Sequence, residues 1–101
     1  MPVYPAKPRK RQPTHPGAVV GSSLDALGRT KSEVAVMLGI SRQHLHGIIA
    51  GDKSVSPDVA ARLGKLFGNG PGLWLRMQAA YDTWQVEHNV DTSNIPTLER
   101  M

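Results

Sequence analysis

Polar side chains suited to reading DNA gather in one short stretch of the chain. They are Ser41, Arg42, Gln43, His44 and His46. Arginine can donate two hydrogen bonds to guanine O6 and N7, and glutamine can pair with adenine N6 and N7, both in the major groove. A serine at a helix start, with the free amides beside it, suits a phosphate oxygen. We therefore expect these residues to contact DNA, together with Lys31 and Lys53 at the two ends of the stretch.

The residues from Lys31 to Lys53 also have the spacing of a helix-turn-helix. The apolar positions of this unit are Val34, Leu38, Ile40, Leu45 and Ile48. Ala35 leaves room for a second helix to cross the first, and Gly39 accepts a positive φ at the turn between them. The pattern predicts one helix over about 31–38 and a recognition helix over about 42–50. A polar helix face alone would be ordinary solvated surface, but this frame favours DNA contact.

The same polar residues do not have the pattern of a metal site or a catalytic centre. His44 and His46 are two positions apart, so they do not face each other on a helix, and no cysteine or nearby carboxylate completes a ligand set. The chain has no cysteine nucleophile and no glycine-rich phosphate loop, and no histidine is paired with an acid and a nucleophile in a recognised order. We expect no metal, no cofactor and no enzymatic activity.

The excess positive charge lies outside the helix-turn-helix unit. The net charge is +4, and the first fifteen residues hold Lys7, Arg9, Lys10 and Arg11 without an acid, so basic and acidic residues balance in the rest. A neutral domain should bind DNA weakly as a single copy, because phosphate contacts supply most nonspecific affinity. We expect a dimer to double the contacts.

The length of 101 residues supports one domain with two flanking segments. Residues 1–14 are predicted to be a flexible, basic, proline-rich arm that is either a solvated tail or lies along DNA. Residues 15–89 form the helix-turn-helix domain, and residues 90–101 are a tail or a dimer strand. The absence of cysteine, of an apolar run long enough to span a membrane and of a signal peptide core predicts a soluble, cytoplasmic protein.

Three further helices complete a predicted all-α, five-helix fold. The first begins at His15 and ends at Gly28, with Val20, Leu24 and Leu27 on one face. His15 caps this helix, contacts a partner or, as is more common for a lone histidine, is incidental. The fourth helix covers about 58–67 and the fifth about 71–88.

The fifth helix carries apolar side chains around more than one stripe, so it needs two surfaces to bury them. One surface is the domain core, and the other is a partner subunit. We assign to a dimer or partner interface the residues Trp74, Met77, Tyr81, Trp84 and, in the tail, Ile95. A single larger core is the alternative.

Motifs on both sides of the helix-turn-helix unit are more particular than the unit itself. They are His15-Pro16-Gly17, Val55-Ser56-Pro57-Asp58, Leu66-Phe67-Gly68 and the run from Leu73 to Asp82. With them, the chain from about Thr14 to Val90 resembles the HigA-type antitoxins of the lambda-repressor-like (XRE) class. The resemblance implies a homodimer on a palindromic operator at its own promoter. It also implies a partner toxin of the HigB type, an mRNA-cleaving ribonuclease.

The tail is where the resemblance to HigA-type antitoxins is least complete. In several relatives the segment after the last helix forms a strand with the dimer mate, and residues 91–95 resemble that segment. Pro96 limits how far a strand can continue, and the basic tail before Thr14 is not part of the family core. A stand-alone XRE-type repressor without a toxin fits the same residues, because a fold does not determine the partner.

Overall fold

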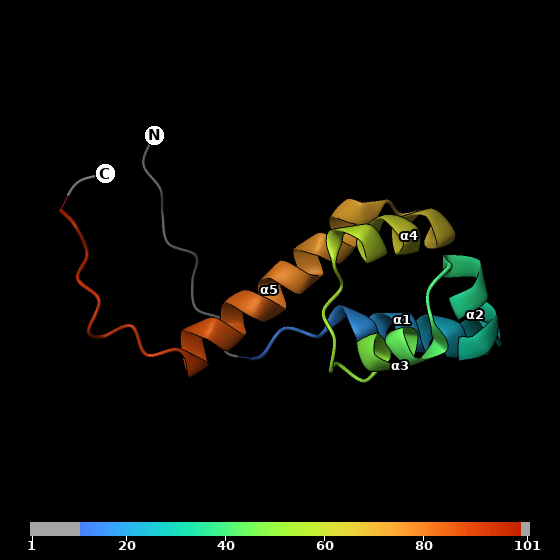
Figure 1. Ribbon diagram of the computed structural model, residues 1–101, viewed down its shortest axis with the longest axis horizontal. Helices are drawn as coiled ribbons and strands as arrows, with labels where there is room; N and C mark the ends of the chain where they lie inside the picture. Colours follow the sequence, from blue (N-terminus) through green and yellow to red (C-terminus); the bar gives the residue numbers. More distant parts are fainter. Residues whose placement is uncertain (1–10, 100–101) are drawn as a thin grey trace.

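The computed structural model describes residues 11–99, where five helices follow one another without a strand (Figure 1). They are α1 (Pro16–Leu27), α2 (Lys31–Leu38), α3 (Arg42–Ile49), α4 (Pro57–Phe67) and α5 (Pro71–Asn89). The predicted all-α class is confirmed. Most of the predicted basic arm, residues 1–10, lies outside the described range. Within that range no helix is long and apolar enough to cross a membrane.

Hydroxyl side chains begin the three central helices. The Oγ1 atom of Thr30 accepts a hydrogen bond from the Glu33 amide at 3.1 Å, and Ser41 and Ser56 accept in the same way at the starts of α3 and α4. Each bond satisfies an amide that has no partner within its helix. Hydrogen bonds from Arg29 and Thr30 to the Glu33 carboxylate hold the pKa of Glu33 below its usual value. The bonds that Thr30 and Glu33 make to each other form a capping box at the start of α2.

The start of α1 is packed directly against the end of α3. The Nδ1 atom of His15 accepts a hydrogen bond from the Gly17 amide at 2.9 Å, so His15 caps α1. Gly17 is buried, and a side chain there would collide with the backbone carbonyl of Ile48. The His15 ring also meets the ring of Tyr81 on α5 edge-on, with centroids 4.9 Å apart. The His15-Pro16-Gly17 motif therefore joins three helices.

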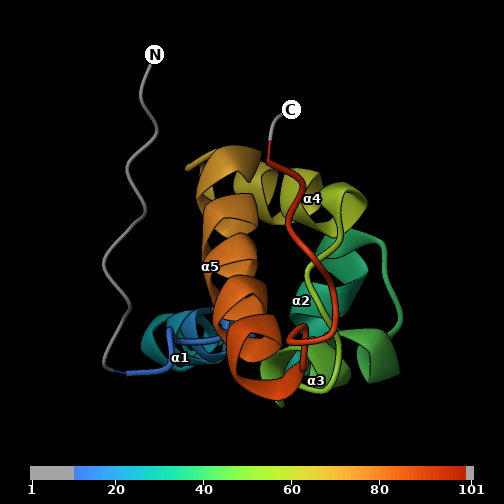
Figure 2. The same cartoon turned by 90° about the vertical axis from the view of Figure 1, so that its left-hand side faces the viewer.

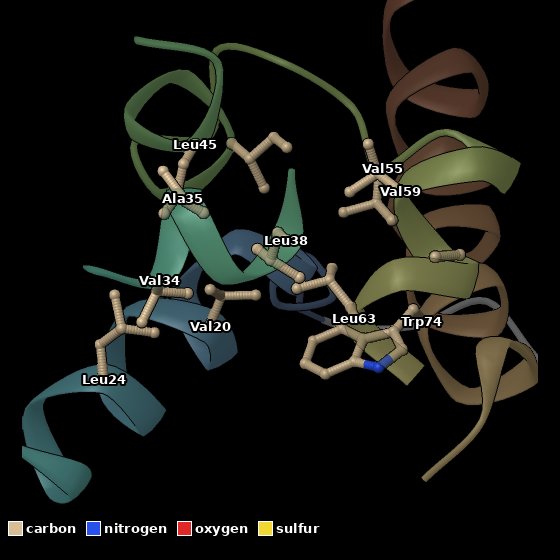
Figure 3. Close-up of a cluster of buried hydrophobic side chains, with 12 residues drawn as sticks. Val20, Leu24, Val34, Ala35, Leu38, Leu45, Val55, Val59, Leu63 and Trp74 are labelled. Carbon is tan, nitrogen blue, oxygen red and sulfur yellow. The ribbon is translucent and has the colours of Figure 1, made fainter. Parts of the chain in front are cut away.

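The core lies where all five helices meet (Figure 3). Its buried members are Val20, Leu24, Val34, Ala35, Leu38, Leu45, Ile48, Val55, Val59, Ala60, Leu63 and Trp74. The assignment of Trp74 to an interface is wrong, because its side chain is only 1% exposed. Its ring lies 5.7 Å from that of Phe67, and its Nε1 atom donates to Asn69 Oδ1 at 2.9 Å. The single larger core is the correct alternative for this residue.

One other expectation differs from the structure, and a strand paired with a dimer mate stays a prediction for the tail. Leu27, expected on one face of α1 with Val20 and Leu24, is the last residue of the helix and is 63% exposed. Residues 90–99 form no strand; the Ile95 amide instead donates to the Thr92 carbonyl at 2.9 Å in a turn. A strand needs a neighbouring strand to pair with, and the described part of this chain offers none.

α5 packs against α4 and α1 (Figure 2), and its C-terminal half extends beyond the other four helices (Figure 1). Sequence patterns gave no sign of its buried polar residue, Gln78, which is 6% exposed. Its Oε1 atom accepts from the Val55 amide at 2.7 Å, and its Nε2 atom donates to Asp82 Oδ1 at 2.9 Å. Gln78 therefore ties the loop between α3 and α4 to α5.

Replacing Gln78 with alanine leaves the buried Val55 amide without an acceptor. We expect Gln78→Ala to lower the free energy of unfolding by about 1–3 kcal/mol, as urea denaturation at fixed protein concentration would measure. Asp82→Asn is the matched control, because the amide oxygen still accepts from Gln78 and the Val55 bond is untouched. Equal stability of Gln78→Ala and the wild type would show that the Val55 bond does not hold the loop.

His15 makes the stability depend on pH. Burial lowers the pKa of His15 below 6.5, opposed by the charge of Asp82 and a hydrogen bond to the Lys53 carbonyl. The unfolded chain therefore takes up a proton at a higher pH than the folded protein does. The stability that neutral His15 contributes is complete above about pH 6.5 and is lost as the pH falls through the folded pKa.

The variant His15→Asn tests this pH dependence, because asparagine keeps a cap acceptor but does not titrate. We expect urea midpoints measured from about pH 7.5 down to pH 5.5 to fall less steeply in the variant than in the wild type. The same slope in both proteins would contradict the assignment of this pH dependence to His15.

Candidate nucleic-acid interface

The outer side of α3 brings together three of the predicted DNA-contacting side chains. Arg42, Gln43 and His46 are all exposed and lie within about 100° of one another around the helix. The opposite side carries Leu45 and Ile48, both 0% exposed. The polar side chains are therefore held on a helix that is anchored in the core.

The turn before α3 has the geometry that the sequence predicted. Gly39 has a φ of 72°, and the Ile40 amide donates to the Ala35 carbonyl at 3.1 Å, which closes the end of α2. Ser41 begins α3 at once and is exposed, with its hydroxyl accepting from the His44 amide at 3.0 Å. The first amides of a helix have no acceptor within it, so this exposed helix start suits a phosphate oxygen.

Arg62 of α4 stabilises this turn through a hydrogen bond to α2. This role was not predicted from the sequence. Its Nη1 atom donates to the Leu38 carbonyl at 2.8 Å, while its Nε atom donates to Asp58 Oδ2 at 3.0 Å. The carbonyl is one of those left free at the end of α2. Asp58 and Arg62 are four residues apart, a spacing that suits an ion pair within one helix, but no local pattern indicates the bond to α2.

Lys31 and His46 form one edge of the interface. The Nζ atom of Lys31, at the start of α2, lies 3.0 Å from the Nδ1 atom of His46. A lysine ammonium can only donate, so Nδ1 accepts and the ring proton sits on Nε2. His46 thereby offers a donor to solvent, which matches an acceptor such as a phosphate oxygen or guanine N7.

Lys53 forms the other edge. The Asp52 and Lys53 amides both donate to the Gly47 carbonyl, at 2.9 and 3.1 Å, so the loop folds back over the end of α3. The aliphatic part of the Lys53 side chain packs over Gly47. A Cβ atom at position 47 would lie only 2.9 Å from the Cδ atom of Lys53. Because Gly47 and Gln43 are one turn apart, the Lys53 stem lies next to the reading side of α3.

His44 does not share the exposed side. It is half-buried and lies about 100° beyond Gln43 around α3, away from Arg42 and His46. Its backbone amide binds Ser41, so its main contribution in this structure is to the helix start.

Of the residues predicted for a dimer or partner interface, Met77, Tyr81 and Trp84 lie within about 60° of one another around α5 and are all partly exposed. Met77 is partly buried against the core, and Tyr81 contacts His15. Trp84 stacks on His88 with centroids 3.8 Å apart, and its Nε1 atom is buried without a hydrogen-bond partner among the described residues. Ile95 is exposed on the tail.

Comparison with known proteins decides the family. Residues 23–74 match the HTH_3 helix-turn-helix family model. Virulence-associated protein A' of Dichelobacter nodosus is 42% identical over 82 residues, covering 80% of this chain and 71% of that protein. The chain belongs to this helix-turn-helix family. Other relatives are named either HTH-type transcriptional regulators, in Escherichia coli, or antitoxin HigA-1, in Vibrio cholerae.

Solved structures of helix-turn-helix antitoxins share the whole fold. An addiction module antidote protein of a HigA family from Coxiella burnetii is 30% identical with a TM-score of 0.77, covering 87% of this chain and 99% of that one. Antitoxin GraA in complex with its operator is 26% identical with a TM-score of 0.78, covering 92% and 95%. The predicted XRE-type class is confirmed, and this helix-turn-helix protein has the DNA-binding fold of the antitoxin type.

Gln43→Ala should remove direct base readout from this helix-turn-helix protein. We expect a loss of about 1–3 kcal/mol in binding to a duplex that carries the specific site of the protein, with no loss on an unrelated duplex. Fluorescence anisotropy with labelled duplexes measures both. Gln85→Ala on α5 is the matched control. If affinity and footprint survive both Arg42→Ala and Gln43→Ala unchanged, α3 is not the reading helix.

Proposed function

We propose that this chain is the antitoxin of a HigBA-type module. It acts as a cytoplasmic homodimer that binds a palindromic operator at its own promoter, represses the operon and neutralises a HigB-type mRNA-cleaving toxin. Its role is binding, not catalysis. The observation that carries the proposal is the rigid exposed side of α3, with Arg42, Gln43 and His46 flanked by Lys31 and Lys53.

The DNA-binding half of the proposal follows from geometry and charge. Ser41 and the two lysines suit phosphate oxygens, and Arg42 and Gln43 suit base edges. The first group would fix the position of the protein on the duplex, and the second would read the base sequence. One copy offers few cations, because the chain from Pro16 onward is neutral. A two-fold dimer on half-sites about 10 bp apart, or a multiple of that, supplies the missing contacts. Antitoxin GraA, which has this fold, has been solved in complex with its operator, and this supports DNA binding by the fold.

The toxin-binding half rests on the relatives. The Coxiella burnetii protein is an addiction module antidote, and the Vibrio cholerae relative is antitoxin HigA-1. The alternative function is a stand-alone XRE-type repressor without a toxin. It is favoured by the Escherichia coli relatives that are named transcriptional regulators. The two functions differ only in a protein contact.

Co-expression with the product of a small adjacent open reading frame separates the two functions. For the antitoxin we expect that product alone to arrest growth, and this chain to restore growth and co-purify with it. The double variant Arg42→Ala/Gln43→Ala is the control, because it should lose promoter repression. The wild type could repress a promoter reporter but neither restore growth nor co-purify with the adjacent product. That result would favour the stand-alone repressor.

A further inference from the structure

Gly47 is a glycine that the backbone of α3 does not need. It lies within the helix, and the positive φ angles in residues 11–99 all belong to other glycines. Glycine destabilises a helix interior relative to alanine, so its presence in this short helix needs another explanation. Outside the helix backbone and the chain neighbours, the three atoms nearest to a Cβ at position 47 would be Cδ, Cγ and Cε of Lys53, at 2.9, 3.0 and 3.2 Å. The missing side chain therefore makes room for that of Lys53.

The main chain of Lys53 is held at both its amide and its carbonyl. The amide donates to the Gly47 carbonyl at 3.1 Å, and the carbonyl accepts a hydrogen bond from His15. The aliphatic part of the side chain then covers Gly47, which is buried, while Lys53 itself stays exposed. Neither ion pair within residues 11–99 involves Lys53, so no acid in that range competes for its ammonium.

Position 47 belongs to the reading side of α3. It lies about 40° beyond Gln43 around the helix and one turn further along it. Because a Cα–Cβ bond in a helix tilts toward the helix start, a side chain at position 47 would extend beside Gln43. The side chain of Lys53 occupies that place instead. Its ammonium, one bond beyond Cε, is therefore on the same side of α3 as Gln43.

We propose that Gly47 is a positioning residue for DNA binding. It lets the Lys53 side chain lie against α3, so that the ammonium meets the phosphate beside the base that Gln43 reads. Ordering a lysine side chain costs conformational entropy, and Lys53 is ordered in this way before DNA arrives. The inference rests on the proposed DNA binding by α3, and it adds the feature that fixes where the Lys53 charge lies.

Gly47→Ala separates DNA binding from stability. The added Cβ displaces only the end of a flexible, exposed side chain, and alanine favours a helix, so we expect the urea midpoint to stay the same or rise. The probe is a duplex that the wild type selects from a random pool. We expect its dissociation constant to rise about threefold to tenfold, and the plot of log affinity against log salt to flatten by about one unit per half-site. Fluorescence anisotropy over a salt series measures both.

Lys53→Met tests whether Gly47 acts through the lysine. Methionine keeps an unbranched apolar side chain over Gly47 but removes the charge. We expect this variant to weaken binding and flatten the salt dependence at least as much as Gly47→Ala does. The double variant Gly47→Ala/Lys53→Met should then bind no more weakly than Lys53→Met alone, because the glycine has no lysine left to position.

Two control variants match these changes away from α3. Gly72→Ala makes the same substitution in α5, where the added Cβ would meet the end of another flexible side chain, the Nη1 atom of Arg76, at 2.9 Å. Lys65→Met removes one positive charge from an exposed position of α4. We expect both controls to keep the affinity and the salt dependence of the wild type.

The outcomes separate this inference from the proposed function. Unchanged affinity and salt dependence in Gly47→Ala would overturn the positioning role and leave DNA binding by α3 intact. A further loss when Gly47→Ala is added to Lys53→Met would also overturn it, because the alanine would then act without the lysine, for example by blocking close approach of the duplex. A wild type that selects no sequence from the pool would overturn the proposed DNA reading and this inference with it.

Discussion

The proposed DNA-reading surface of α3 depends on the burial of Leu45 and Ile48. α3 spans Arg42–Ile49, and a helix of that length is not stable in water by itself. Its conformation comes from two side chains that are 0% exposed and from the Ser41 cap. Arg42 and Gln43 are therefore positioned by the core of the whole domain, and anything that loosens the core also loosens the interface.

Contacts from outside the helix-turn-helix unit complete this support. His15 joins α1, the Lys53 carbonyl and Tyr81, and Gln78 holds the Val55 amide. Both residues fasten the loop that carries Lys53 across α3. Arg62 fastens the turn at the other end of the unit through the Leu38 carbonyl. The helices around the unit thus hold both edges of the interface.

Local patterns were enough to predict the frame of the fold. Glycine at the α2–α3 turn, hydroxyl caps and apolar spacing act within a few residues, so they can be read from the chain directly. The bond from Arg62 to Leu38 and the bond from Gln78 to Val55 join residues 24 and 23 positions apart, and no local pattern encodes them. Trp74 was misplaced for a related reason. The sequence shows that α5 has apolar side chains on more than one side, so two surfaces must bury them. Only the packing shows that the chain's own core buries Trp74.

The most direct test of DNA reading by α3 is methylation interference on the operator. Methylation of guanine N7 blocks the acceptor that Arg42 or His46 would use in the major groove, whereas methylation of adenine N3 changes only the minor groove. Reading by α3 predicts that N7 methylation abolishes binding at guanines in both half-sites, and that N3 methylation within them is tolerated. Interference from N3 alone, with N7 methylation tolerated, would show that α3 does not enter the major groove.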